Sequence, residues 1–144
     1  MPDACEMPRD NAGPEEVREI LETARTVAVV GLSDKPDRDS YHVAAYLQRA
    51  GYRIIPVNPM VKEVLGEKAY ARLRDVPGRI DVVDVFRKAE AVPEIVEDAI
   101  AVGAKAVWMQ EGVVHNAAAD KARAAGLTVV MDRCLLKEHR KMGA

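Results

Sequence analysis

The sequence has few of the features that mark several common classes of protein. Only two of its 144 residues are cysteine, Cys5 and Cys134, and they have neither the spacing of a metal site nor the pattern of a disulfide framework. We therefore expect both to be free thiols. The net charge is −2, which gives no general attraction to nucleic acid or to an anionic membrane. Any phosphate that the protein binds must be held by local groups.

Long apolar runs and catalytic constellations are missing as well. No stretch approaches the roughly 18 to 20 residues that span a bilayer, and residues 1–16 lack the basic start and apolar core of a signal peptide. We expect a cytoplasmic protein. The three histidines are scattered, without a Ser, Cys or Asp at the spacing of a catalytic relay. Catalytic groups are therefore hard to find in the sequence, and whether the protein is an enzyme stays open, with a protein that is not an enzyme favoured.

What is present is enough for one globular domain. Hydrophobic residues make up 49% of the chain and charged residues 31%, a balance typical of a globular protein with a proper core. We expect a flexible N-terminus over residues 1–12 and a single domain over residues 13–144.

Strand patterns alternate with helical patterns along this domain. Apolar runs predict five strands, at 26–30, 52–59, 79–86, 104–110 and 127–132. Helical spacing predicts helices at about 13–25, 40–50, 90–103 and 116–126, with a short helix between 63 and 78. Such alternation requires parallel strands joined by right-handed crossovers. The expected fold is α/β, a Rossmann-like doubly wound five-stranded sheet with helices on both faces and strand order 3-2-1-4-5. Pro56 is expected at the fraying end of the second strand.

The first strand leads into a polar loop that differs from a dinucleotide fingerprint. Gly31 ends the strand, but Ser33 and Pro36 stand where further glycines are expected. Ser33, Lys35 and Ser40 offer hydroxyl groups and a positive charge, and the N–H groups at the start of the next helix favour an anion. The loop thus predicts a phosphate site, with a plain surface loop and helix cap as the alternative.

Polar segments also follow the next three strands. Asn58 stands where an NAD site usually has an acid, although Asn58 and Pro59 are also a common rigid turn. Arg87 and Lys88 are either phosphate ligands or solvated charges. The segment after the fourth strand is either a structural turn or a ligand contact, and consists of Gln110, Glu111 and Gly112.

Two residues with reactive side chains lie further along the chain. His115, beside Asn116, fits a helix start better than a general base. Cys134 follows Arg133, but a lone cysteine at such a position is more often inert.

Taken together, these segments resemble the small CoA-binding proteins, whose domain is similar to the N-terminal CoA-binding domain of the succinyl-CoA synthetase alpha subunit. The resemblance covers about residues 14–136 and rests on the order and spacing of six stretches: VAVVGLSDKPDRDSYHVAAYL, GYRIIPVNP, VLGEKAY, IDVVDVFRKAEAVPEIVEDAI, GAKAVWMQEGV and AGLTVVMDRC.

The resemblance implies coenzyme A or an acyl-CoA at the carboxyl edge of the sheet. The expected contacts are Gly31, Leu32, Ser33, Lys35, Ser40, Tyr41, Asn58, Pro59, Val85, Phe86, Arg87, Gln110, Glu111 and Gly112. Gly31, Ser33, Lys35 and Ser40 would surround the phosphates. The phosphohistidine of the synthetase belongs to a second domain, so His115 does not inherit that role. An NAD(P)-dependent oxidoreductase, an acyl-CoA enzyme using Cys134 and an interaction domain without a nucleotide stay open as alternatives, as does a protein partner.

Overall fold

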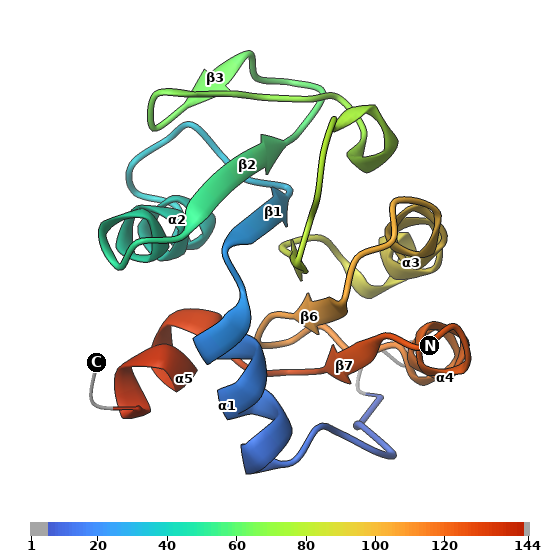
Figure 1. Cartoon of the computed structure of the whole chain (residues 1–144). Helices are drawn as coiled ribbons and strands as arrows, with labels where there is room; N and C mark the ends of the chain where they lie inside the picture. Colours follow the sequence, from blue (N-terminus) through green and yellow to red (C-terminus); the bar gives the residue numbers. More distant parts are fainter. Residues whose placement is uncertain (1–5, 143–144) are drawn as a thin grey trace.

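The computed structural model describes residues 6–142 and arranges them in three layers (Figure 1). Across this range the middle layer is a five-stranded parallel sheet in the order β2-β1-β5-β6-β7. Its strands are β1 (Thr26–Val30), β2 (Arg53–Val57), β5 (Val82–Val85), β6 (Ala106–Met109) and β7 (Thr128–Val130). One face is covered by α1 (Pro14–Thr23), α2 (Asp39–Arg49) and α5 (Leu135–Lys141), the other by α3 (Val92–Ala101) and α4 (Asn116–Ala124). The predicted α/β class is confirmed.

The sheet is buried on both faces, as a parallel sheet between helices must be. Val29 and Trp108 pack into the core shared with Leu47 of α2. On the opposite face, Val83 packs into the core shared with Ile95 of α3. Because both faces are filled by apolar side chains, a ligand site has to lie at an edge of the sheet.

The strand order predicted from the sequence is wrong. We expected 3-2-1-4-5, but the third of these strands, β5, pairs directly with β1, so that the order is 2-1-3-4-5 in the same numbering. Pro56 supplies the physical reason. It lies within β2 rather than at a fraying end, and its carbonyl oxygen accepts from Tyr70 N–H at 3.0 Å on the outer side, where its missing N–H would also point. A proline is tolerated on such an edge strand and not in the middle of a sheet.

The segment 63–78 also differs from the prediction of a short helix. It forms a small hairpin and a 3₁₀ turn, namely β3 (Glu63–Val64), β4 (Glu67–Lys68) and η2 (Leu73–Asp75). The two residues between the strands, Leu65 and Gly66, have φ angles of 55° and 80°. Two consecutive positive φ values are typical of a type I′ hairpin turn.

The helices mostly follow their local sequence signals. Pro93 lies in the first turn of α3, as predicted, and a 3₁₀ turn, η3 (Ala89–Ala91), precedes it. The sequence interpretation ended at the fifth strand and did not include α5. Of the helices described, none is long and apolar enough to cross a membrane.

Residues 6–12 have no regular secondary structure but lie against the domain. Arg9 N–H donates to Oδ1 of Asn116 at 2.8 Å, and Asn11 Nδ2 donates to the carbonyl of Met131 at 2.9 Å. The predicted flexible N-terminus thus makes specific contacts over its described part. Residues 1–5, and with them Cys5, lie outside the described residues.

Candidate functional site

The direction of the chain crossovers reverses between β1 and β5. The connection after β1 leads to β2 on one side, and the connection after β2 leads to β5 on the other side of β1. In open α/β sheets, ligands bind outside the carboxyl ends of the strands at such a reversal. The predicted order would have placed β5 beyond β2. The observed order instead brings the loop after β1 directly beside the end of β5.

Gly31 lies at this junction with a φ of +91°. Its N–H donates to the carbonyl of Val57 at 2.8 Å. A Cβ atom here would lie 2.5 Å from the carbonyl oxygen of Phe86 and 2.9 Å from Cδ of Arg87. Glycine is therefore required both by the backbone conformation and by the close approach of Phe86 and Arg87, the two residues after β5.

The loop after β1 is held in shape by its own serines. Ser40 Oγ accepts from Ser33 N–H at 3.0 Å, and Ser33 Oγ accepts from Lys35 N–H at 3.0 Å. Since each oxygen serves as an acceptor, each hydroxyl hydrogen is left to donate. Next to them α2 begins at Asp39, and its N-cap, Arg38, makes no side-chain capping bond within residues 6–142. The first N–H groups of α2 can therefore serve an anion.

Asn58 joins the loop after β2 to the loop after β1. Its Nδ2 donates to the carbonyl of Leu32 at 3.0 Å, and its Oδ1 accepts from Met60 N–H at 2.9 Å. These bonds are those of a structural turn. The side chain keeps one amide hydrogen that a ligand at this edge can use.

The remaining predicted contacts differ in what they can offer. Leu32 and Val85 bury their side chains completely, in the cores on opposite faces of the sheet, so that only their backbone atoms can face a ligand. Tyr41 is half-buried against the core, whereas Lys35 and Pro59 are exposed.

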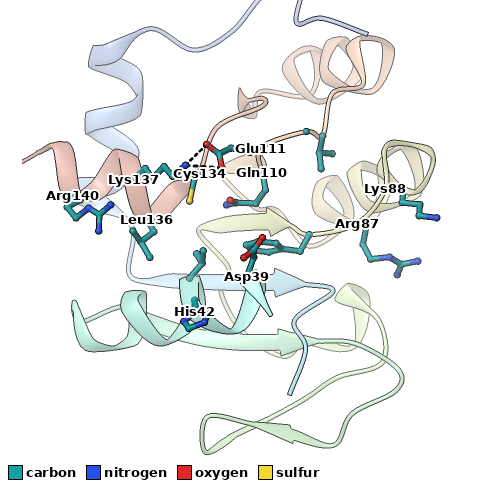
Figure 2. A pocket seen from close by; sticks show the side chains of 14 residues that line it. Asp39, His42, Arg87, Lys88, Gln110, Glu111, Cys134, Leu136, Lys137 and Arg140 are labelled. Atoms are coloured by element: carbon teal, nitrogen blue, oxygen red, sulfur yellow. Dashed lines mark hydrogen bonds and ion pairs between the residues drawn. The ribbon is translucent and has the colours of Figure 1, made fainter. Parts of the chain in front are cut away.

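A cavity of about 770 Å³ opens at the carboxyl ends of β5, β6 and β7, between α2 and α5 (Figure 2). Five predicted contacts line it: Phe86, Arg87, Gln110, Glu111 and Gly112. The wall is completed by residues outside the predicted set, which are Asp39, His42, Val43, Lys88, Val113, Cys134, Leu136, Lys137 and Arg140.

The residues missed by the sequence prediction come mainly from two helices. Asp39 and His42 on α2 are three residues apart, as are Lys137 and Arg140 on α5. Residues at this spacing share one face of a helix. The spacing is visible in the sequence, but only the fold shows that both faces meet the same cavity.

Positive charge dominates the cavity wall. Lys137 donates to both carboxylate oxygens of Glu111, at 3.0 and 3.2 Å, and this hydrogen bond and the charge of Glu111 raise the pKa of Lys137. Arg87, Lys88 and Arg140 form no ion pair with any described residue. Figure 2 shows Arg87 and Lys88 on the side of the cavity opposite Arg140. The wall suits a ligand that carries negative charge.

Asp84 is completely buried in β5 and is hydrogen-bonded to Gln110, which lines the cavity. Its Oδ1 accepts from Gln110 Nε2 at 2.5 Å, and its Oδ2 has no partner in the part of the chain that the structure describes. Burial raises the pKa of Asp84 to about 7, although the hydrogen bond from Gln110 acts to lower it. Sequence reasoning missed Asp84. The sequence feature that could have indicated Asp84 is a single acidic residue within the apolar run VVDV.

The candidate reactive groups show no catalytic pairing. Cys134 lines the cavity, and its thiol makes no hydrogen bond to a described residue. His115 caps α4 by accepting from Ala118 N–H at 3.1 Å, which confirms its predicted place at a helix start. His139 is buried, with Nδ1 2.8 Å from the hydroxyl of Tyr46. Neither of these two histidines forms a hydrogen bond with the thiol of Cys134 in the described part of the chain.

A doubly wound parallel sheet with helices on both faces and a serine-containing loop after its first strand defines a Rossmann-like α/β domain. Residues 25–140 match the family model described as "CoA binding domain", and the chain belongs to this family. The match agrees with the resemblance that the sequence stretches suggested.

Some relatives match this chain over almost their whole length, and others only over a small part of a longer enzyme. The chain is 43% identical over 129 residues to the uncharacterized protein YneT of Bacillus subtilis (strain 168), covering 90% of this chain and 96% of that protein. A solved structure described as a hypothetical protein from Pyrococcus horikoshii OT3 superposes with a TM-score of 0.90 at 42% identity, covering 100% of both chains. Acetate-CoA ligase II (ADP-forming) of Archaeoglobus fulgidus is 29% identical over 83 residues, covering 56% of this chain but 12% of the ligase. None of these three relatives favours the nicotinamide or acyl-enzyme alternatives.

Proposed function

We propose that residues 13–144 act as a single domain that binds coenzyme A along the carboxyl edge of the sheet, without catalysis of its own. Membership of the CoA binding domain family supports the ligand class. The cationic cavity wall supports a ligand that carries several negative charges.

The start of α2 carries this proposal. Its uncapped N–H groups, the hydroxyl groups of Ser33 and Ser40 and the exposed charge of Lys35 all lie at the crossover reversal. A diphosphate presents several acceptor oxygens and negative charge, which is what these donors can satisfy. Ser33 and Lys35 would thus replace the glycines by which dinucleotide enzymes approach a pyrophosphate.

The length of the sheet edge fits an extended ligand. From β2 to β7 the edge spans four strand spacings, about 19 Å. With the phosphates at α2, the adenosine part would lie beside Asn58 and Pro59. The pantetheine arm would then cross the end of β5 and bring its thiol into the cavity beside Gln110 and Cys134.

Calorimetry with CoA and with NAD tests this function. We expect CoA to bind and NAD to bind far more weakly, because Asn58 stands in place of the acid that takes the ribose hydroxyls. In the Lys35→Ala variant the affinity for CoA should fall about 10- to 150-fold, since one charge-assisted contact of roughly 1.5 to 3 kcal/mol is lost. Melting temperature in the absence of ligand should stay unchanged, because an exposed lysine adds little to stability.

Lys121→Ala is the matched control. Lys121 is exposed on α4, on the other face of the sheet, and pairs with Glu97 at the surface. Its loss should leave CoA affinity unchanged. Tight binding of NAD without binding of CoA would overturn the proposal. Equal CoA affinity for wild type and Lys35→Ala at low salt would show that Lys35 does not contact the phosphates.

A further inference from the structure

The proposed contacts leave Asp84 without a role, although it is a costly residue to place in the core. It is completely buried in the middle of the sheet, between Val29 of β1 and Trp108 of β6. A buried carboxyl group with an unpartnered oxygen is normally selected against. The one described side chain that donates to it is that of Gln110, which reaches the cavity.

Asp84 determines which end of the Gln110 amide faces the cavity. The Oδ1 atom of Asp84 only accepts, so the amide group of Gln110 must present its nitrogen to Asp84. Above about pH 7 Asp84 is ionised and fixes this arrangement, and the neutral acid keeps it when its proton resides on the unpartnered Oδ2. The amide oxygen of Gln110 accepts no hydrogen bond from residues 6–142 and is the atom left for the cavity. Gln110 itself is fixed by backbone bonds to Val85 and Val113.

We propose that Asp84 is a positioning residue that holds the oxygen of the Gln110 amide toward the cavity and thereby makes the site prefer free CoA to its thioesters. The inference rests on the proposed function, which brings the thiol end of CoA to Gln110. A free thiol donates a hydrogen bond, although a weak one, whereas the carbonyl oxygen of a thioester only accepts. An oxygen at this position therefore complements the thiol and opposes an acyl group. The cavity volume of about 770 Å³ leaves room for a short acyl chain, so size alone does not exclude it.

The test compares CoA with acetyl-CoA by calorimetry in the presence of a phosphine reductant, which prevents disulfide formation with Cys134. Wild type should bind CoA about 2- to 5-fold more tightly than acetyl-CoA, the range of one weak hydrogen bond. Asp84→Asn adds an amide donor beside its acceptor oxygen and no longer fixes the direction of the Gln110 amide, so the ratio of the two affinities should fall between the wild-type value and one. Asp84→Leu removes the acceptor at similar volume and frees the amide to turn, so the ratio should fall to about one.

Gln110→Leu provides the second variant, in case Asp84→Leu does not fold. It removes the amide itself and should also bring the ratio to about one. A general loss of stability lowers both affinities together and leaves the ratio unchanged, so the ratio separates positioning from a structural role. A steric preference for CoA would likewise persist in both leucine variants.

The outcomes are distinct. Equal wild-type affinities for CoA and acetyl-CoA, or a wild-type ratio retained in a folded leucine variant, would overturn the role of Asp84 while leaving the CoA function intact. If wild type binds neither ligand, the proposed function fails and this inference fails with it.

Discussion

Asp84 is a buried carboxyl group whose pKa differs strongly from that of a free aspartate side chain. Burial raises its pKa to about 7, against an unfolded value of about 3.9. Between these values the unfolded chain is ionised while the folded protein still holds the proton. The folded state therefore binds more protons, and its stability falls as the pH rises through this window.

The Asp84→Asn variant should reveal this cost. Asparagine does not ionise, so the free energy of unfolding of the variant, relative to wild type, should rise by about 4 kcal/mol from pH 4 to pH 8. Urea denaturation at several pH values measures the difference, and the other titrating groups cancel because both proteins contain them. A difference that stays flat across this range would show that Asp84 is not strongly perturbed.

At the scale of the elements, short helices depend on how their first N–H groups are satisfied. Helix α4 has nine residues, and the side chain of its N-cap, His115, accepts from Ala118 N–H. Glu6 adds a second acceptor, for the N–H of Asn116, and this backbone hydrogen bond is the main cause that lowers the pKa of Glu6. The start of α4 is thus capped by its own N-cap residue, His115, and by Glu6 from the other end of the chain.

Replacing His115 by alanine should cost about 1 kcal/mol of unfolding free energy, because a cap acceptor is lost. His115→Asn is the matched control, since asparagine is a good N-cap and should preserve most of the stability. His115 does not line the cavity, so CoA affinity should be equal in both variants and wild type. A loss of CoA binding in a stable His115 variant would assign the residue to the site after all.

At the scale of the whole molecule, a buried carboxylate connects strands at the amino edge of the sheet. Asp81 lies just before β5, and its carboxylate accepts from the N–H groups of Arg25 and Thr26 at 2.9 and 3.0 Å. Arg79 and Lys105 lie 3.3 and 3.9 Å from it. Burial by itself raises the pKa of Asp81, but these hydrogen bonds and charges outweigh it, and the pKa is lowered.

Asp81→Asn should therefore destabilise the protein at pH 7, by about 1 to 3 kcal/mol, because the ionised acceptor of two N–H groups is lost. A lowered pKa means that this stabilisation is present above the unfolded value and is lost as the pH falls through the folded one. The difference from wild type should thus shrink below about pH 4. Its trend with pH is opposite in sign to that expected for Asp84→Asn, and a constant difference would contradict the account.

The helices and strands that follow a clear local pattern of apolar residues were predicted well from the sequence. The predicted strand at 26–30 has the same bounds as β1, and Gly31 lies so close to Phe86 and Arg87 that no side chain fits there. The segment 63–78 was predicted less well, because its hairpin turn places Leu65, rather than a typical turn residue, at a positive φ. Helix α5 was missed because it is short.

The sequence by itself determined the fold class, the five strands and the polar loops that follow them, because apolar periodicity and turn residues act within a few positions of the chain. Only the tertiary structure decided the strand order, since buried parallel strands look alike in sequence and choose neighbours by how the whole sheet is covered. It also decided the cavity, whose wall combines α2 with α5, and the pairing of Asp84 with Gln110 across 26 positions. A hydrogen bond between such distant residues exists only once β5 and β6 lie side by side, and no local pattern encodes it.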